Sequence, residues 1–123
     1  MMKLEPLRAY MLEKTGVTEE QPFGPDALVF KVVGKMFALV AWQDRPLRVN
    51  LKCDPDLALT LREQYQAVIP GYHMNKKHWN TVILDDTIPG DEVTGMIDHS
   101  YELVVSGLKK ADRQKLQAME GDT

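Results

Sequence analysis

The stretch "LVFKVVGKMFALVAW", residues 28–42, decides the fold of this chain. Its two halves are dense in valine, leucine and phenylalanine, and only Gly34 and Lys35 interrupt them. β-Branched and aromatic residues favour strands, and a glycine between two such runs is typical of a turn. The stretch therefore predicts an antiparallel β-hairpin.

A third strand is predicted after the turn "QDRP". Residues 47–52, "LRVNLK", place Leu or Val at every odd position and Arg, Asn or Lys at every even position. A period of two is typical of a strand with one face on the core and the other in water. Lys31 is expected to join this wet face from the neighbouring strand.

The N-terminal segment predicts a helix over residues 4–14. Leu4, Leu7 and Met11 fall at helical spacing, and Gly16 is a suitable residue to end the helix. Residues 18–27, "TEEQPFGPDA", are expected to form a loop because two prolines and a glycine interrupt them.

A second helix is predicted from Pro55. Asp54 can cap its free N–H groups, and proline is well tolerated at the first helical position. The spacing of Leu57, Leu61 and Tyr65 predicts that these side chains form its inner stripe.

The C-terminal part predicts a strand, a long helix and a shorter helix. "WNTVIL" from Trp79 is the strand, residues 88–108 are the long helix, and residues 109–119 are the shorter one. Residues 119–123 are expected to fray. The inner side of the long helix is predicted to carry Val93, Met96, Ile97, Ser100 and Val104.

This order of elements predicts an α+β fold in a single domain over residues 1–123. The expected architecture is a mostly antiparallel sheet with helices packed on one face. A chain of 123 residues with 44% hydrophobic content can bury one core. No run is apolar enough to cross a membrane, and the N-terminus does not resemble a signal peptide, so a cytoplasmic protein is expected.

Charge and cysteine content narrow the function classes. Cys53 is the only cysteine, which excludes an internal disulfide and a cysteine-based zinc cluster within one chain. The net charge of -3 argues against a surface that is basic all round. However, five basic residues lie between Asp26 and Asp54, whereas residues 85–102 carry six acids and no Lys or Arg. A local basic patch is therefore compatible with the acidic total.

Several residues with reactive side chains have plainer interpretations. His73 and His78 are five positions apart, which suits neither a helical metal pair nor one face of a strand, so no metal site is predicted. Cys53 is interpreted as a small apolar core residue. Trp42 and Trp79 are interpreted as core or sheet-face aromatics, with nucleobase stacking by Trp79 as the alternative.

No enzyme or cofactor is predicted. Residues 98–102, "DHSYE", contain the residue types of a hydrolase triad, but neighbours on a helix point about 100° apart and cannot face one another. No nucleotide-binding glycine loop and no HExxH motif is present in the sequence.

Four segments together resemble the MmcQ/YjbR family of small bacterial proteins. They are "PFGPDALVFKVVGKMFAL", "LKCDPDLALTLRE", "GYHMNKKHWNTVILD" and "IPGDEVTGMIDHSYELVVSGL", in the family's order. The most specific element is the Asn-Lys-x-His-Trp signature, carried here by Asn75, Lys76, His78 and Trp79. Asp86 departs from the pattern because a glycine is common after Asp85 in the family.

The resemblance implies a fold similar to the bacterial frataxin CyaY. It also implies weak and largely non-specific binding to double-stranded DNA, through two projections that have been likened to a double wing. A monomer is expected. On this hypothesis the nucleic-acid-binding residues are Lys31, Lys35, Arg45, Arg48, Lys52, Asn75, Lys76, Lys77, His78 and Trp79.

Two other interpretations remain open. In the first, the chain is a small protein-interaction or ligand-binding domain with no nucleic-acid role, and the signature is structural. In the second, acidic side chains hold a hard cation weakly through oxygen ligands. The acids concerned are Asp85, Asp86, Asp91, Glu92, Asp98 and Glu102.

Overall fold

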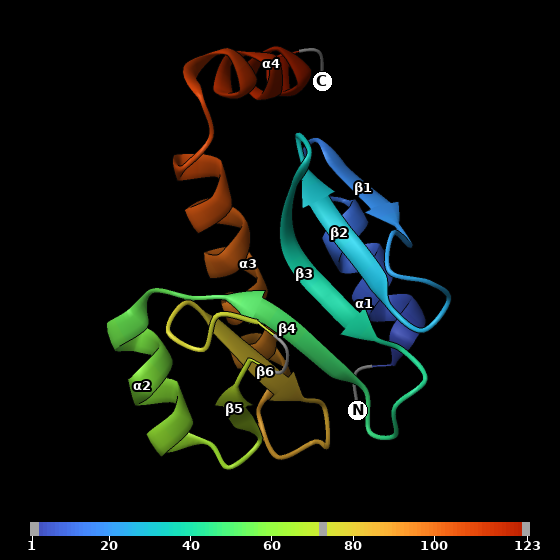
Figure 1. Cartoon of the computed structure of the whole chain (residues 1–123), viewed down its shortest axis with the longest axis vertical. Helices are drawn as coiled ribbons and strands as arrows, with labels where there is room; N and C mark the ends of the chain where they lie inside the picture. The colour runs from blue at the N-terminus through green and yellow to red at the C-terminus, as the bar shows by residue number, and fades with distance from the viewer. Residues whose placement is uncertain (1–2, 72–73, 122–123) are drawn as a thin grey trace.

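A six-stranded antiparallel sheet forms the framework of the molecule (Figure 1). The computed structural model describes residues 3–71 and 74–121. The strands follow one another across the sheet in the order β1-β2-β3-β4-β6-β5. They are β1 (Val17–Glu20), β2 (Leu28–Val32), β3 (Lys35–Ala41), β4 (Arg48–Lys52), β5 (Val68–Pro70) and β6 (Trp79–Ile83).

The predicted hairpin is confirmed as β2 and β3. Its turn is the dipeptide Val33-Gly34, and both residues have positive φ, at 47° and 80°. Two-residue turns of this handedness match the twist of the strands that they join. The alternation predicted over residues 47–52 is confirmed for the inner face, because Leu47, Val49 and Leu51 are buried, but Asn50 on the other face is buried as well.

Two strands occur where the sequence did not predict them. The range 18–27 was predicted as a loop, but β1 pairs antiparallel with β2 through Val17↔Val32 and Glu20↔Val29. β1 was not predicted because "VTEE" is short and polar, and its strand conformation depends on its pairing with β2. β5 has only three residues and pairs with β6.

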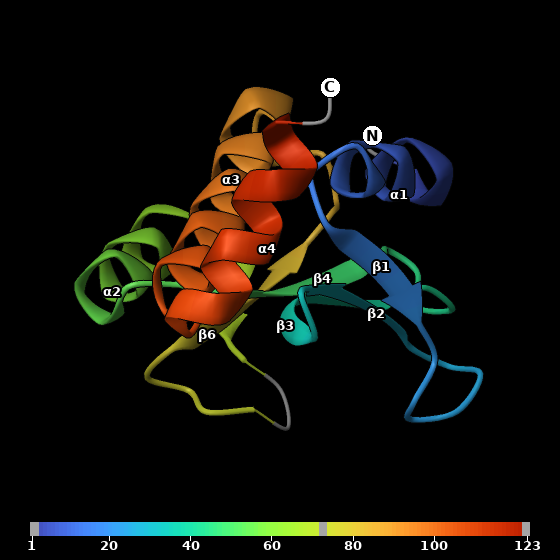
Figure 2. The same cartoon turned by 90° about the horizontal axis from the view of Figure 1, so that it is seen from above.

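Four helices pack against the sheet. They are α1 (Leu4–Leu12), α2 (Pro55–Gln64), α3 (Gly90–Ser106) and α4 (Lys110–Gly121). Figure 2 shows α3 on one side of the sheet, while the loop after β1 and the loop before β6 project from the other side. Within the described residues, no helix combines the length and the apolar character that a membrane span requires.

The helix α3 buries the row that the sequence predicted. Val93, Met96, Ile97, Ser100 and Val104 are its buried residues. They meet the inner side of the sheet, where Phe30, Phe37, Val40 and Val49 are fully buried. The main core therefore lies between α3 and the central strands.

The prediction for α2 is partly wrong. Asp54 caps the helix as expected, since its side chain accepts hydrogen bonds from the backbone N–H groups of Asp56 and Leu57. However, the buried residues are Ala58 and Leu61, and Leu57 is 38% exposed. The helix is rotated so that Leu57 lies at a boundary with solvent.

The C-terminal helix extends further than predicted. Residues 119–121, which were expected to fray, continue α4, and the last two residues lie outside the described part of the chain. The buried side chain of Leu116 holds α4 against the rest of the fold. Its Cδ1 lies beside Gly16, where an added Cβ would come within 2.7 Å.

Candidate nucleic-acid interface

The side of the sheet that faces away from α3 is called the open face here. Cross-strand pairing places Leu39 opposite Asn50, Asn50 opposite Thr81, and Lys52 opposite Trp79 on this face. The sequence predicted a wet, polar surface, but Asn50 and Thr81 are buried and hydrogen-bonded to each other, with Thr81 Oγ1 2.5 Å from Asn50 Oδ1. The open face is therefore less polar than the alternation suggested.

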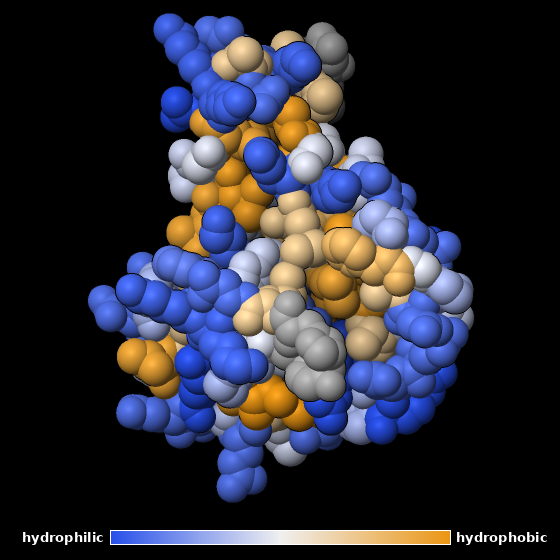
Figure 3. All heavy atoms as spheres, viewed as in Figure 1, coloured by the Kyte–Doolittle hydropathy of each residue, from blue (hydrophilic) through white to orange (hydrophobic). Residues whose placement is uncertain are grey.

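A groove of about 520 Å³ runs over the open face. It lies between the two projecting loops, because its walls include Phe23 and Ala27 from one loop and Met74 and Asn75 from the other. Phe23 is 69% exposed. In Figure 3, hydrophobic residues gather over the strands on this side and hydrophilic residues surround them. The complete lining is Phe23, Ala27, Met36, Leu39, Ala41, Asn50, Met74, Asn75 and Trp79.

The family signature forms a tight turn, called the signature turn here, over residues 75–79. Asn75 Oδ1 accepts a hydrogen bond of 2.9 Å from the backbone N–H of Lys77, and the N–H of His78 donates to the Asn75 carbonyl at 3.2 Å. The carbonyl of His78 in turn accepts from the N–H of Cys53 at 2.8 Å. Asn75 thus shapes the turn, and the side chains of Lys76 and Lys77 remain exposed.

Arg62 anchors this turn from α2, and sequence reasoning missed it. Its Nε donates to Asn80 Oδ1 at 2.7 Å, and its Nη2 donates to the carbonyl oxygens of Trp79, at 3.3 Å, and Lys76. A guanidinium can hold several acceptors in one fixed fork. No local sequence signal points to these contacts, because they join residues 14 to 18 positions apart.

The indole of Trp79 lies on the open face and is half-buried. It lines the groove together with Met74 and Asn75. His78 is also half-buried, and its backbone groups are both engaged in the turn. The side chains of His78 and Trp79 are therefore neither fully buried in the core nor fully exposed to solvent.

The basic residues do not all converge on one surface. Lys31 forms an ion pair with Glu20 at 3.5 Å, and Arg48 lies 3.9 Å from Asp44. Arg45 donates to the backbone carbonyls of Trp42 and Asp44.

Lys35 does not belong to the open face. It pairs with Val32 at the end of the hairpin, in the row that faces the helices. Across residues 3–71 and 74–121, Lys52, Lys76 and Lys77 have no acidic partner. These three lysines supply the unneutralised positive charge near Trp79.

The remaining candidate residues do not assemble into a reactive site. Cys53 is buried, and burial, followed by the charge of Asp54, raises the pKa of its thiol to about 11. His99 Nε2 accepts from the backbone N–H of Asp54 at 3.2 Å. Of the residues that the structure describes, no three His, Cys, Asp or Glu side chains come together to hold a metal ion, and His73 lies outside them.

Known proteins similar to this chain show which family it belongs to. The YjbR family model matches residues 12–103. The chain is 41% identical over 96 residues to the uncharacterized protein YbdF of Escherichia coli O157:H7, covering 78% of this chain and 79% of that protein. It is 34% identical over 115 residues to the uncharacterized protein YjbR of Escherichia coli K12, covering 94% and 98%.

Solved structures give the same result. The crystal structure of Deinococcus radiodurans protein DR2400 is similar with a TM-score of 0.89 and 40% identity, covering 95% of this chain and 89% of that chain. A Pseudomonas syringae protein is similar with a TM-score of 0.73 and 29% identity, covering 83% and 98%. The chain therefore belongs to the YjbR family.

Proposed function

We propose that this chain binds nucleic acid across its open face and prefers a single strand to a duplex. The observation that carries this proposal is the pairing of Trp79 with Lys52 beside the exposed Lys76 and Lys77. A half-exposed indole offers a stacking surface for a base, and lysines at its side offer contacts to phosphates. The nucleic-acid strand would lie in the groove between the two loops.

The apolar character of the groove favours unpaired bases. Met36, Leu39 and the exposed ring of Phe23 lie along the same groove as Trp79. In a duplex the faces of the bases are stacked on one another, so an indole cannot reach them without opening the helix. The family resemblance implies a double-wing protein that binds a duplex, so the preference for a single strand rests on the groove and on Trp79 and not on the resemblance.

The charge of the face supports only weak binding. Three lysines without acidic partners would contact about three phosphates, for which the slope of log K against log salt is about -2 for a single strand. The binding should be insensitive to base sequence because stacking discriminates little between bases.

The first test is a salt-dependent anisotropy titration with a fluorescent oligothymidylate, at about 25 to 200 mM salt. The double variant Lys76→Glu/Lys77→Glu is expected to lose most of the affinity and to flatten the salt slope. Lys109→Glu/Lys110→Glu, at the start of α4, makes the same change in net charge away from the open face and should bind like the parent protein. Equal losses in both variants would show that only net charge matters and would refute the interface.

The second test concerns the indole. Trp79→Ala is expected to weaken oligothymidylate binding about tenfold, since stacking contributes ~1–3 kcal/mol per base, and Trp79→Phe should restore part of it. A duplex of the same length should bind more weakly than the single strand. No binding at low salt, or binding that is unchanged in Trp79→Ala, would contradict the proposal.

A protein ligand is the second candidate, because the groove of about 520 Å³ is lined largely by apolar side chains and includes the exposed Phe23. Such a complex would depend little on salt and would survive Lys76→Glu/Lys77→Glu. The salt titration therefore separates the two functions.

A further inference from the structure

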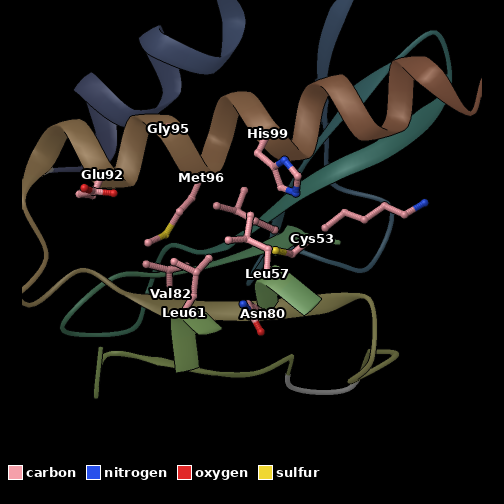
Figure 4. A pocket seen from close by; sticks show the side chains of 11 residues that line it. Cys53, Leu57, Leu61, Asn80, Val82, Glu92, Gly95, Met96 and His99 are labelled. Carbon is pink, nitrogen blue, oxygen red and sulfur yellow. The ribbon is translucent and has the colours of Figure 1, made fainter. Parts of the chain in front are cut away.

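A second recess lies on the other side of the sheet, between α2, α3 and the strands β4 and β6. Its volume is about 150 Å³. Figure 4 shows side chains from both helices and from the sheet around it, with Asn80 at its floor and His99 and Met96 above. Its lining is Leu51, Lys52, Cys53, Leu57, Leu61, Asn80, Val82, Glu92, Gly95, Met96 and His99.

Asn80 brings an unused hydrogen-bond donor to this recess. The residue is 2% exposed, and its Nδ2 has no hydrogen-bond partner within the described part of the chain. Its Oδ1 accepts from Arg62 Nε at 2.7 Å. Because a guanidinium only donates, this bond fixes which end of the amide is the oxygen, and Nδ2 is left on the side of the recess in Figure 4.

A buried donor without a partner carries a desolvation penalty that an acceptor would remove. Ordinary proteins leave few such groups, so this one calls for an explanation. No acceptor from residues 3–71 or 74–121 is in place, and the surrounding leucine, valine and methionine side chains offer poor support for an ordered water. The arrangement is that of a ligand pocket, with apolar walls and one placed polar group.

The ligand should carry no charge. The inner walls are formed by Leu51, Leu61, Val82 and Met96, and the charged residues of the lining are the half-buried Lys52 and the exposed Glu92. The thiol of Cys53 stays protonated at neutral pH because burial raises its pKa to about 11. His99 already uses Nε2 as an acceptor from the backbone of Asp54. The desolvation penalty for burying an ion against these walls would far exceed the free energy gained from one hydrogen bond.

We propose that this recess binds a small uncharged organic molecule, about the size of a six-membered ring, through one carbonyl oxygen that accepts from Asn80 Nδ2. An apolar protein cavity of 150 Å³ is large enough for benzene. Because Nδ2 is closed off from solvent, the ligand must turn aside a side chain at the mouth. Leu57 can do this, since it lines the recess and is 38% exposed. This recess shares no lining residue with the groove on the open face, although Lys52 of the open face also borders the recess.

The test compares two probes of one shape in ¹H–¹⁵N NMR titrations. Cyclohexanone carries the carbonyl acceptor, and methylenecyclohexane replaces the oxygen with a CH₂ group. Cyclohexanone is expected to bind about tenfold more tightly and to shift the Asn80 side-chain NH₂ signals, because only the ketone pairs the donor. Equal affinities, or shifts confined to the open face, would overturn the proposal.

A pair of variants provides the matched control. Leu57→Trp enlarges the side chain at the mouth and should abolish the cyclohexanone shifts. Leu59→Trp makes the same replacement on the same helix at a position that is 57% exposed and does not line the recess, and it should leave the binding unchanged. Both positions are at least partly in solvent, so both variants should fold. Retained binding in Leu57→Trp would contradict the site.

Discussion

Residues 98–101, "DHSY", hold α3 to the rest of the fold. Ser100 Oγ accepts from the backbone N–H of Lys52 at 2.9 Å and donates to the Phe37 carbonyl at 2.6 Å. Tyr101 OH donates to the Thr15 carbonyl at 2.7 Å. Their residue types suggested catalysis, and adjacency argued against it. Their structural partners lie up to 88 positions away, so the sequence could not predict them.

Ser100→Ala is expected to destabilise the protein by about 1–3 kcal/mol, because it leaves a buried N–H and a buried carbonyl without a partner. Urea unfolding followed by circular dichroism would measure the loss. Ser106→Ala is the control, since its hydroxyl is exposed and bonds only within α3, and it should change stability by less than about 0.5 kcal/mol. Similar losses for the two variants would argue against the bridging role of Ser100.

Asp98 should make stability depend on pH. Burial by itself raises the pKa of its carboxyl, but hydrogen bonds from Lys14 Nζ and Tyr10 OH outweigh burial, and the pKa is lowered overall. A carboxyl with a lowered folded-state pKa contributes stability above its unfolded value of ~3.9 and loses it as pH falls through the folded value.

Asp98→Asn should therefore be less stable than the parent at pH 7 and should lose less stability between about pH 5 and pH 2. Urea melts of both proteins across this range give the comparison. Parallel pH profiles would show that other carboxyls dominate acid unfolding.

At the scale of elements, the periodicity of the sequence predicted the strands and the helix face whose burial follows that periodicity. The hairpin, β4 and the buried row of α3 were all predicted, because period two and period 3.6 reflect one buried face. The rotation of α2 depends on its contacts with β5 and β6, and the formation of β1 depends on its pairing with β2. These features follow from partners distant in sequence.

The start of α2 offers a direct test. Asp54→Ala removes the cap on two N–H groups and is expected to cost about 1 kcal/mol. Thermal unfolding would show this as a fall in Tm of several degrees. Asp26→Ala, in an exposed loop, removes one carboxylate without a cap and should leave Tm nearly unchanged. An equal fall in Asp26→Ala would attribute the effect to charge.

At the scale of the whole molecule, the sheet lies between the exposed acids of α3 and the lysines of the signature turn. Asp91, Glu92 and Glu102 are exposed on α3, whereas the signature turn projects from the other side (Figure 2). The acidic total therefore does not bring carboxylates of α3 onto the open face. The sequence showed one basic and one acidic segment, but it did not show on which side of the sheet each segment would lie. The apolar groove was not predicted, because it forms between two loops distant in sequence.

Unfolding of the whole molecule should control how fast its single thiol reacts. Cys53 is buried and its pKa is raised to about 11, so the native protein should react with Ellman's reagent at pH 8 at least ~100-fold more slowly than the unfolded chain. Rapid labelling of the native protein would contradict the closed environment around Cys53. Urea should raise the labelling rate in step with the unfolded population.

The two outermost strands of the sheet have a consequence for behaviour at high concentration. β1 carries Glu19 and Glu20, and β5 is three residues long and ends in Pro70. Such margins are poor templates for a strand from another copy, since a second glutamate row would repel and a proline has no N–H to donate. We therefore expect the chain to resist growing into fibrils through continuous β-pairing, although its central strands are strongly apolar.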